Sequence, residues 1–230
     1  MNIAVYSGSF NPLHIGHLAI IRHMIDEAGF DCVYLVVSPK NPLKEGISAD
    51  SGLDRYNAAV AAVARHFSNT GRRNVNDCER AEHIPISLQS EPQSSYLPSD
   101  RMYSTYSAAS EQVRKVIVDD IELRMPPPHY TIRTLDALKE REPYNTFTLI
   151  MGADNLADIR RWRDYTRILK EYGVAVFPRT GIDLSMVKTD LLTEDPSFHI
   201  RLLDAEMVDI SSTTIRNALA EGQDMSAWLM

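Results

Sequence analysis

The first 37 residues constrain the fold of this chain more than any other stretch. Residues Ile3–Ser7 form a short apolar run that leads into a glycine, as is typical of a buried strand. After a glycine-containing turn, apolar residues recur at helical spacing, and Gly29 marks the end of this pattern. Residues Cys32–Val37 form a second apolar run. The order strand, turn, helix, strand predicts a βαβ unit at the start of a parallel sheet.

The same alternation continues along the chain. Further strands are expected at Val116–Glu122, Phe147–Met151 and Val174–Phe177. Helices are expected at Tyr130–Glu140, Leu156–Trp162 and Thr213–Glu221. Because helices alternate with the strands, we predict an α/β fold with a Rossmann-like doubly wound parallel sheet. The length of 230 residues is compatible with a single domain over residues 1–230.

Residues 68–114 interrupt this alternation. They are rich in Ser, Asn, Gln and Pro, and no apolar period of a strand or a helix persists through them. We predict a polar surface insertion, as a loop or a disordered segment. The alternative is that its tyrosines, Tyr96, Tyr103 and Tyr106, mark a contact with a partner or a second subunit, which leaves a homo-oligomer open.

Composition excludes several classes of function. The formal net charge of −7 argues against a general surface for nucleic acid or for an acidic membrane. Cys32 and Cys78 lie far apart, which suggests neither a zinc site nor a disulfide framework. The chain opens without a leader-like segment, and no apolar run approaches the roughly 20 residues that span a bilayer. We therefore expect a cytoplasmic protein with no membrane segment and no protein-held metal.

The turn after the first run, GSFNPLHIGH, has the features of an anion site. Gly8 and Gly16 let a ligand approach the backbone closely, and the start of the following helix offers free N–H groups. His14 and His17 are one helical turn apart, so both rings can donate to the same phosphate. The alternatives are capping or surface histidines, or a metal pair that lacks a third ligand. The position between a strand and a helix favours phosphate.

A second candidate lies near the other end, in ISSTTIR, residues 210–216. Ser211 or Ser212 is suited to cap the helix that follows. Ser212 and Thr213 offer hydroxyl and backbone donors, and Arg216 lies one turn further along. The alternative is an ordinary capped surface helix.

Taken together, HIGH and ISSTTIR resemble the nucleotidyltransferase superfamily that transfers AMP or CMP from a nucleoside triphosphate. More closely, the chain resembles the bacterial nicotinate-mononucleotide adenylyltransferases over most of its length outside residues 68–114. Seven blocks in the family's order carry this resemblance: GSFNPLHIGH, SPKNPLK, PPHYTIRTL, MGADNL, RRWRDY, VFPRTG and ISSTTIR.

The resemblance implies a nucleotidyltransferase domain that joins nicotinate mononucleotide to the AMP part of ATP and releases pyrophosphate, a step of NAD biosynthesis. The attacking phosphate oxygen is already an anion, so the reaction needs neither a general base nor a covalent intermediate. Mg²⁺ is expected to arrive with ATP, because it prefers substrate phosphates and water to a dedicated protein cage.

The resemblance also implies roles on the ATP side. It assigns the catalytic contacts to His14, His17, Lys44 and Arg216, and the ATP-binding contacts to Gly8, Ser9, Phe10, Asp154, Ser211, Ser212 and Thr213. Lys44 stands where many relatives have histidine, and its alternative is an exposed surface lysine. The alternative for Asp154 is a helix cap, a role that is compatible with nucleotide binding.

On the acceptor side, the resemblance implies that Trp162 stacks on the pyridine ring, with Tyr130 and Arg163 nearby. The backbone N–H of Thr131, and the one next to Trp162, would bind the nicotinate carboxylate. The alternative for Trp162 is a core position. His129 departs from the family, which commonly has serine before this Tyr-Thr pair.

Two further departures are the long insertion at 68–114 and the absence of the helical tail that relatives usually carry. The rival readings are a phosphopantetheine adenylyltransferase, which shares the HxGH pattern, and a nucleotide-binding relative without catalysis. Trp162 and the HYT block favour nicotinate mononucleotide over phosphopantetheine, and the intact His14, His17 and Arg216 favour catalysis.

Overall fold

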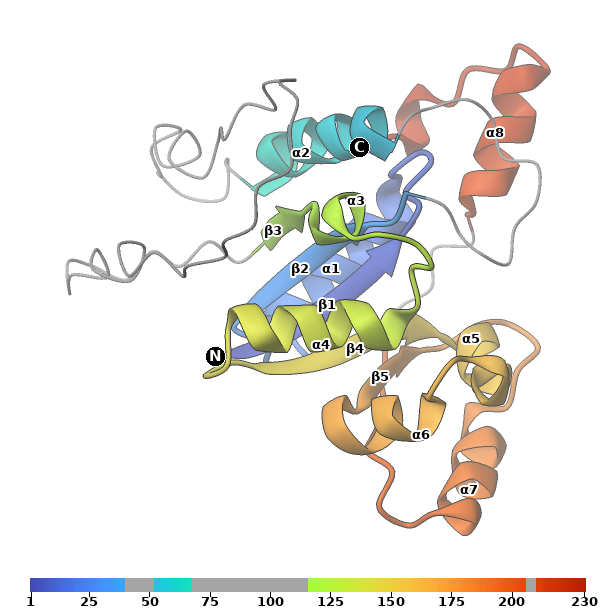
Figure 1. The fold of residues 1–230 in the computed structure, drawn as a ribbon. Helices are drawn as coiled ribbons and strands as arrows, with labels where there is room; N and C mark the ends of the chain where they lie inside the picture. Colours follow the sequence, from blue (N-terminus) through green and yellow to red (C-terminus); the bar gives the residue numbers. More distant parts are fainter. Residues whose placement is uncertain (40–51, 68–115, 206–209) are drawn as a thin grey trace, which may run out of the picture.

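The chain folds around a six-stranded parallel sheet with helices on both faces (Figure 1). The computed structural model describes residues 1–39, 52–67, 116–205 and 210–230. The strand order is β3-β2-β1-β4-β5-β6, and every neighbouring pair is parallel. The chain therefore winds outward from β1 in one direction and then, from β4, in the other. This is the predicted Rossmann-like doubly wound sheet.

The elements follow the expected alternation. The strands are β1 (Asn2–Gly8), β2 (Cys32–Val37), β3 (Val116–Asp119), β4 (Thr146–Gly152), β5 (Val174–Phe177) and β6 (Ile200–Leu202). The helices are α1 (Ile15–Asp26), α2 (Gly52–Phe67), α3 (Ile121–Arg124), α4 (Thr131–Arg141), α5 (Ala153–Ala157), α6 (Tyr165–Arg167), α7 (Leu184–Glu194) and α8 (Ser212–Ala220). Short 3₁₀ turns at Ile159–Arg161 and Ser226–Trp228, and a π-helical segment at Ile168–Tyr172, complete the described structure.

Alternate side chains of the buried strands build a separate core on each face of the sheet. Ile3 and Val5 of β1 point to the face covered by α4 and α7, whereas Ala4 and Tyr6 point to the face covered by α1 and α2. Since β2 is buried on both sides along its whole length, it is a continuous apolar run rather than an alternating one. This rigid centre fixes where β1 and β4 end.

Two expected boundaries are wrong. The strand predicted at Val116–Glu122 ends at Asp119, because the Asp119 carboxylate accepts the Ile121 N–H at 2.9 Å and starts the short helix α3. The helix predicted at Leu156–Trp162 is instead α5, which begins earlier at Ala153, followed by a 3₁₀ turn that ends at Arg161. In both places a turn near an aspartate divides an apolar stretch that the sequence pattern reads as one element.

Other expectations agree closely with the structure. The helices predicted at Tyr130–Glu140 and Thr213–Glu221 are α4 and α8, each displaced by one residue. Gly29 lies just beyond α1 with a φ of 75°, which suits a glycine at the end of a helix. The insertion predicted at 68–114 and the residue Lys44 lie outside the described residues.

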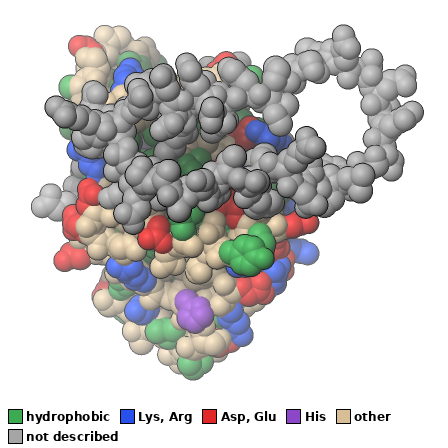
Figure 2. Space-filling model, turned by 90° about the vertical axis from the view of Figure 1, so that its left-hand side faces the viewer, with side chains coloured by type: hydrophobic (Ala, Val, Ile, Leu, Met, Phe, Trp, Pro, Cys, Tyr) green, Lys and Arg blue, Asp and Glu red, His purple; other side chains and the backbone are tan. Residues whose placement is uncertain are grey.

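Many oppositely charged side chains form ion pairs on the described surface. On the face that Figure 2 presents, acidic and basic side chains are interspersed rather than gathered by sign. Arg167, for example, pairs with both Asp136 and Glu171, at 3.0 and 2.8 Å. Among the helices of the described ranges, none combines the length and the apolar character that a bilayer crossing requires.

Candidate active site

The candidate site lies where the strand order reverses, at the carboxyl ends of β1 and β4. In a doubly wound sheet, the connections leaving two such strands diverge to opposite faces and leave a crevice between them. Here a cavity of about 230 Å³ opens at that edge. Gly8 and Ser9 line it from the end of β1, Met151 from β4 and Asn155 from α5. The fold alone therefore predicts a ligand site at this position.

All four residues expected on the acceptor side line this same cavity: Tyr130, Thr131, Trp162 and Arg163. Thr131 is the first residue of α4, so its N–H has no preceding helical carbonyl to bind. The Trp162 N–H is used within the fold, since it donates to the Ile159 carbonyl at 2.8 Å. The Trp162 side chain is half-buried and also packs against the core. Trp162 therefore packs against the core and also lines the cavity, and its stacking on a pyridine ring stays a prediction.

The loop after β1 takes a strained course that shapes the site. Phe10 has a φ of 44°, in the left-handed region that non-glycine residues rarely adopt. Its buried ring packs edge-on against Tyr6 and His17, with centroid distances of 5.4 and 5.2 Å. A Cβ on Gly8 would lie 3.1 Å from the Phe10 ring. Gly8 is therefore needed so that Phe10 can fold back under the histidines.

His14 and His17 lie together at the start of α1. Their ring centroids are 3.7 Å apart, and the His14 N–H donates to His17 Nδ1 at 3.2 Å. Because Nδ1 of His17 accepts this bond, its neutral ring carries the proton on Nε2. His14 is only 4% exposed, and its Nδ1 has no hydrogen-bond partner among the described residues.

Burial controls the charge of both rings. Desolvation, and then the positive charge of Arg179, lower the pKa of His14 to about 4. Desolvation, and then the neighbouring His14 and Arg179, hold the pKa of His17 well below its ordinary value. At neutral pH both imidazoles are therefore uncharged, and each can donate a hydrogen bond without carrying a charge.

The C-terminal segment packs directly against the loop that carries the histidines. Ser211 caps α8, because its Oγ accepts the Thr214 N–H at 3.1 Å. The Ser212 hydroxyl donates to the Pro12 carbonyl at 3.1 Å. Arg216 donates to the Asn11 carbonyl at 2.7 Å, across 205 residues of sequence. The two stretches that the sequence analysis paired are therefore adjacent in the fold.

The Arg216 guanidinium and the start of α8 both contact the loop that precedes α1. A second guanidinium nitrogen of Arg216 donates to Thr213 Oγ1 at 3.0 Å. Gly16 lets this segment approach, because a Cβ there would lie 3.2 Å from Ile210 and 3.0 Å from the His14 ring. His14, His17, Thr213 and Arg216 are thus held around the start of α1, beside the cavity rather than within its lining.

Asp154 and Arg179 form the third side of the site. Asp154 lies in the first turn of α5, directly after β4, and its Oδ1 is 3.5 Å from Arg179 Nε. A Cβ on Gly152 would lie 2.7 Å from the same Asp154 oxygen. Asp154 is thus paired with Arg179, and its contact with a nucleotide stays a prediction.

Three site residues were missed by the sequence analysis. Arg179 follows β5 at the same edge of the sheet, and the VFPRTG block to which it belongs is the sequence signal for it. The guanidinium of Arg55 is buried and donates to the carbonyls of Ser9, Ser38 and Pro39 at 2.6, 2.7 and 2.7 Å. Glu122 lines the cavity although it was expected within a strand. No periodicity distinguishes Arg55 or Glu122 from surface charges.

Comparisons with known proteins identify the class. The family model described as cytidylyltransferase-like matches residues 5–218 of the chain. A structure from Plasmodium falciparum, a nicotinic acid mononucleotide adenylyltransferase complexed with NaAD, has the same fold, with a TM-score of 0.61 and 17% identity over 98% of this chain and 87% of its own. The chain therefore belongs to the cytidylyltransferase-like nucleotidyltransferases.

Relatives that match along the whole chain identify its family within this class. A curated relative from Flavobacterium johnsoniae is 33% identical over 100% of this chain and 92% of its own length. Another from Porphyromonas gingivalis is 32% identical over 100% of this chain and 89% of its own length. Both carry the name "probable nicotinate-nucleotide adenylyltransferase". Within its class, the chain is a member of the nicotinate-nucleotide adenylyltransferase family.

Proposed function

We propose that this protein transfers the adenylyl group of ATP to the 5′-phosphate of nicotinate mononucleotide, giving nicotinate adenine dinucleotide and pyrophosphate. One observation carries the proposal. The cavity at the reversal of strand order is lined by Thr131 and Trp162 as well as by Gly8 and Ser9, and the paired histidines lie at the start of the helix that follows this loop. An acceptor nucleotide in this cavity would present its phosphate to a second nucleotide held at the start of α1.

The chemistry is a single displacement. An oxygen of the acceptor phosphate forms a bond to the α-phosphorus of ATP, and the bond from that phosphorus to the bridging oxygen breaks. The electron pair of the broken bond leaves with pyrophosphate. Because the nucleophile is already an anion, no proton needs to be removed, and catalysis depends on alignment and on stabilising charge.

His14 and His17 supply the stabilising donors. His14 is buried, His17 is half-buried, and both rings are neutral, so in a low-dielectric site their hydrogen bonds to a phosphate oxygen are stronger than in water. The Nε2–H of His17 is a fixed donor, because Nδ1 of the same ring is engaged by the His14 N–H. As negative charge grows on the leaving pyrophosphate, these donors strengthen their hold on it without any reorganisation of solvent.

The remaining ATP contacts come from three elements. Gly8, Ser9 and Phe10 would face the nucleotide from the loop after β1, and Asp154 would meet it from α5. Ser211, Ser212 and Thr213 would offer the amino end of α8, and Arg216 would add positive charge. Lys44, outside the described residues, completes the proposed set.

Mg²⁺ enters as part of the Mg-ATP substrate. Within the described ranges, no group of three His, Cys, Asp or Glu side chains is arranged to hold a metal ion. Mg²⁺ prefers substrate phosphates and water as ligands, so it is suited to arrive already bound to ATP. When bound, the ion would neutralise charge on the triphosphate.

The acceptor contacts define the choice of substrate. The half-buried Trp162 offers an indole face to the cationic pyridinium, a contact worth about 0.5–2 kcal/mol. The N–H of Thr131 at the positive end of α4, which has no acceptor among the described residues, suits a carboxylate on the pyridine ring. We therefore propose nicotinate mononucleotide rather than phosphopantetheine, which has no aromatic ring to stack.

The test measures pyrophosphate release with Mg-ATP and, in parallel, nicotinate mononucleotide, nicotinamide mononucleotide or phosphopantetheine. Release at least about 10-fold faster with nicotinate mononucleotide is expected. His14→Ala should slow turnover at least about 100-fold, the usual cost of losing a transition-state donor. His23→Ala is the matched control, since His23 lies on the same helix but contacts Glu27 at its far end. Faster release with phosphopantetheine, or ATP binding without release, would contradict the proposal.

A further inference from the structure

A buried carboxylate at the inner wall of the cavity has no role in the proposed transfer. Glu122 lies in α3 and is only 3% exposed, yet it lines the cavity together with Ser7 and Ser38. Burying a carboxylate is costly unless it is well hydrogen-bonded. A site that must accept two phosphorylated substrates gains nothing from an extra negative charge unless that charge meets a donor.

The hydrogen bonds of Glu122 engage only one of its two oxygens. Oε1 accepts from the Thr134 hydroxyl at 2.8 Å and from the Ser7 hydroxyl at 3.2 Å. The Ser7 hydroxyl in turn contacts the Ser38 hydroxyl at 3.1 Å. Within the described residues, no hydrogen bond reaches Oε2, and this oxygen is not among the fully buried atoms that lack a partner. Oε2 is therefore accessible, on a residue that lines the cavity, and has an unused capacity to accept.

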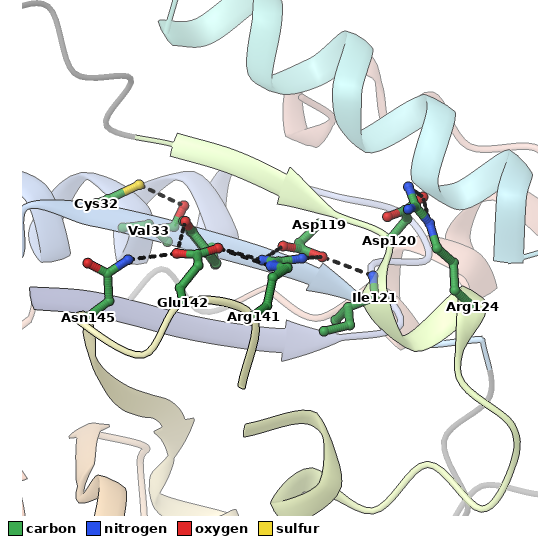
Figure 3. A network of polar contacts seen from close by, with 10 residues as sticks. Cys32, Val33, Asp119, Asp120, Ile121, Arg124, Arg141, Glu142 and Asn145 are labelled. Atoms are coloured by element: carbon green, nitrogen blue, oxygen red, sulfur yellow. Dashed lines mark hydrogen bonds and ion pairs between the residues drawn. The ribbon is translucent and has the colours of Figure 1, made fainter. Parts of the chain in front are cut away.

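The position of Glu122 is fixed from outside the cavity. Asp119 accepts the Ile121 N–H at 2.9 Å and so anchors the start of α3. The Arg141 guanidinium holds the Asp119 carboxylate through two bonds, at 3.2 and 2.5 Å, as Figure 3 shows. This network links the end of β3 to the end of α4. The turn that presents Glu122 is therefore rigid, which is what a specific contact requires.

A second unused polar atom lies in the same wall. His129 also lines the cavity, and its buried Nδ1 has no hydrogen-bond partner among the described residues. Buried polar atoms are normally paired, so an unpaired one beside a cavity indicates a contact completed by a ligand or by water. The cavity lining therefore includes two side chains, Glu122 and His129, that each have a polar atom without a hydrogen-bond partner among the described residues.

The geometry points to Glu122 as a specificity-determining residue that accepts a hydrogen bond from a ribose hydroxyl of the acceptor nucleotide. This inference rests on the proposed function. If the pyridine lies at Thr131 and Trp162 and the phosphate at Ser9, the sugar joins them across the wall that holds Glu122. An ionised carboxylate can only accept, so it suits a hydroxyl and repels a phosphate. It would thus also prevent the acceptor from binding in the reversed direction.

The test compares Glu122→Gln with Thr134→Val in steady-state kinetics. Gln keeps an acceptor for Ser7 and Thr134 but removes the charge, so KM for nicotinate mononucleotide should rise about 10-fold, with kcat and KM for ATP within about 2-fold. Thr134→Val is the structural control, because it breaks the other side of the same bond and leaves the cavity-facing oxygen in place. It should change the acceptor KM less than about 3-fold.

Analogues of the acceptor that lack the 2′- or the 3′-hydroxyl identify the contact. The analogue without the contacted hydroxyl should bind more weakly to the unaltered protein and show no further loss with Glu122→Gln. The inference is overturned if Glu122→Gln leaves the acceptor KM unchanged, if Thr134→Val reproduces its effect, or if its penalty persists with both analogues. If Glu122→Gln does not fold, an unchanged KM for both analogues on the unaltered protein overturns it. Absence of turnover by the unaltered protein would instead refute the proposed function.

Discussion

The neutral histidine pair, of which His14 is buried, predicts a specific loss of stability at acidic pH. Because burial and Arg179 lower the pKa of His14 from 6.5 to about 4, the unfolded chain binds a proton more readily than the folded protein does. The stabilisation is complete above the unfolded pKa and is lost as the pH falls through 6.5 toward 4. For His14 alone, the free energy of unfolding should fall by about 2 kcal/mol between pH 7 and pH 5. His17 acts in the same direction.

Urea unfolding at both pH values measures this loss. Other groups also titrate, so the informative quantity is the difference between the unaltered protein and His14→Asn. The variant should lose about 2 kcal/mol less on acidification. If His14→Asn and the unaltered protein lose equal stability, the His14 ring is not held neutral, and the account of uncharged donors is wrong.

Three further predictions concern the other walls of the site. Trp162→Ala should raise KM for nicotinate mononucleotide about 2- to 30-fold and leave KM for ATP unchanged; a change confined to ATP would contradict the stacking role. Arg216→Lys should raise KM for ATP about 10-fold, since an ammonium cannot fork between the Asn11 carbonyl and the Thr213 hydroxyl. Arg55→Gln should lower the free energy of unfolding, measured in urea, by about 2–4 kcal/mol, because it removes buried hydrogen bonds to three backbone carbonyls. A loss below about 0.5 kcal/mol would show that these hydrogen bonds do not stabilise the fold.

Much of the fold could be predicted because its signals are local. The strands at Asn2–Gly8 and Cys32–Val37 are short apolar runs, and Gly29 ends the helix between them. The strand β6, only three residues long, carries no such signal. Nor does α7, because only Leu184 and Leu191 of its residues are buried and its remaining side chains are mostly polar. The order of the strands in the sheet depends on how the elements pack, so no single segment of the sequence predicts it.

The site was predictable only in part. Ser212 and Arg216 approach the loop after β1 through contacts that span 200 and 205 residues, and the resemblance rather than any spacing paired them with the histidines. Glu122 was assigned to a strand, since a turn made by a single aspartate side chain does not disturb an apolar pattern. The N–H groups that we propose for the nicotinate carboxylate belong to the backbone, so the identity of a residue gives no signal for them.

We propose that the adenylyl group is transferred in a single in-line displacement, with the neutral rings of His14 and His17 as hydrogen-bond donors. The most direct measurement uses ATP made chiral at its α-phosphorus with sulfur, and determines the configuration of that phosphorus in the dinucleotide product. One displacement inverts the configuration, which is the predicted result. Retention would require two displacements through a covalent adenylyl-enzyme intermediate, and would contradict the account.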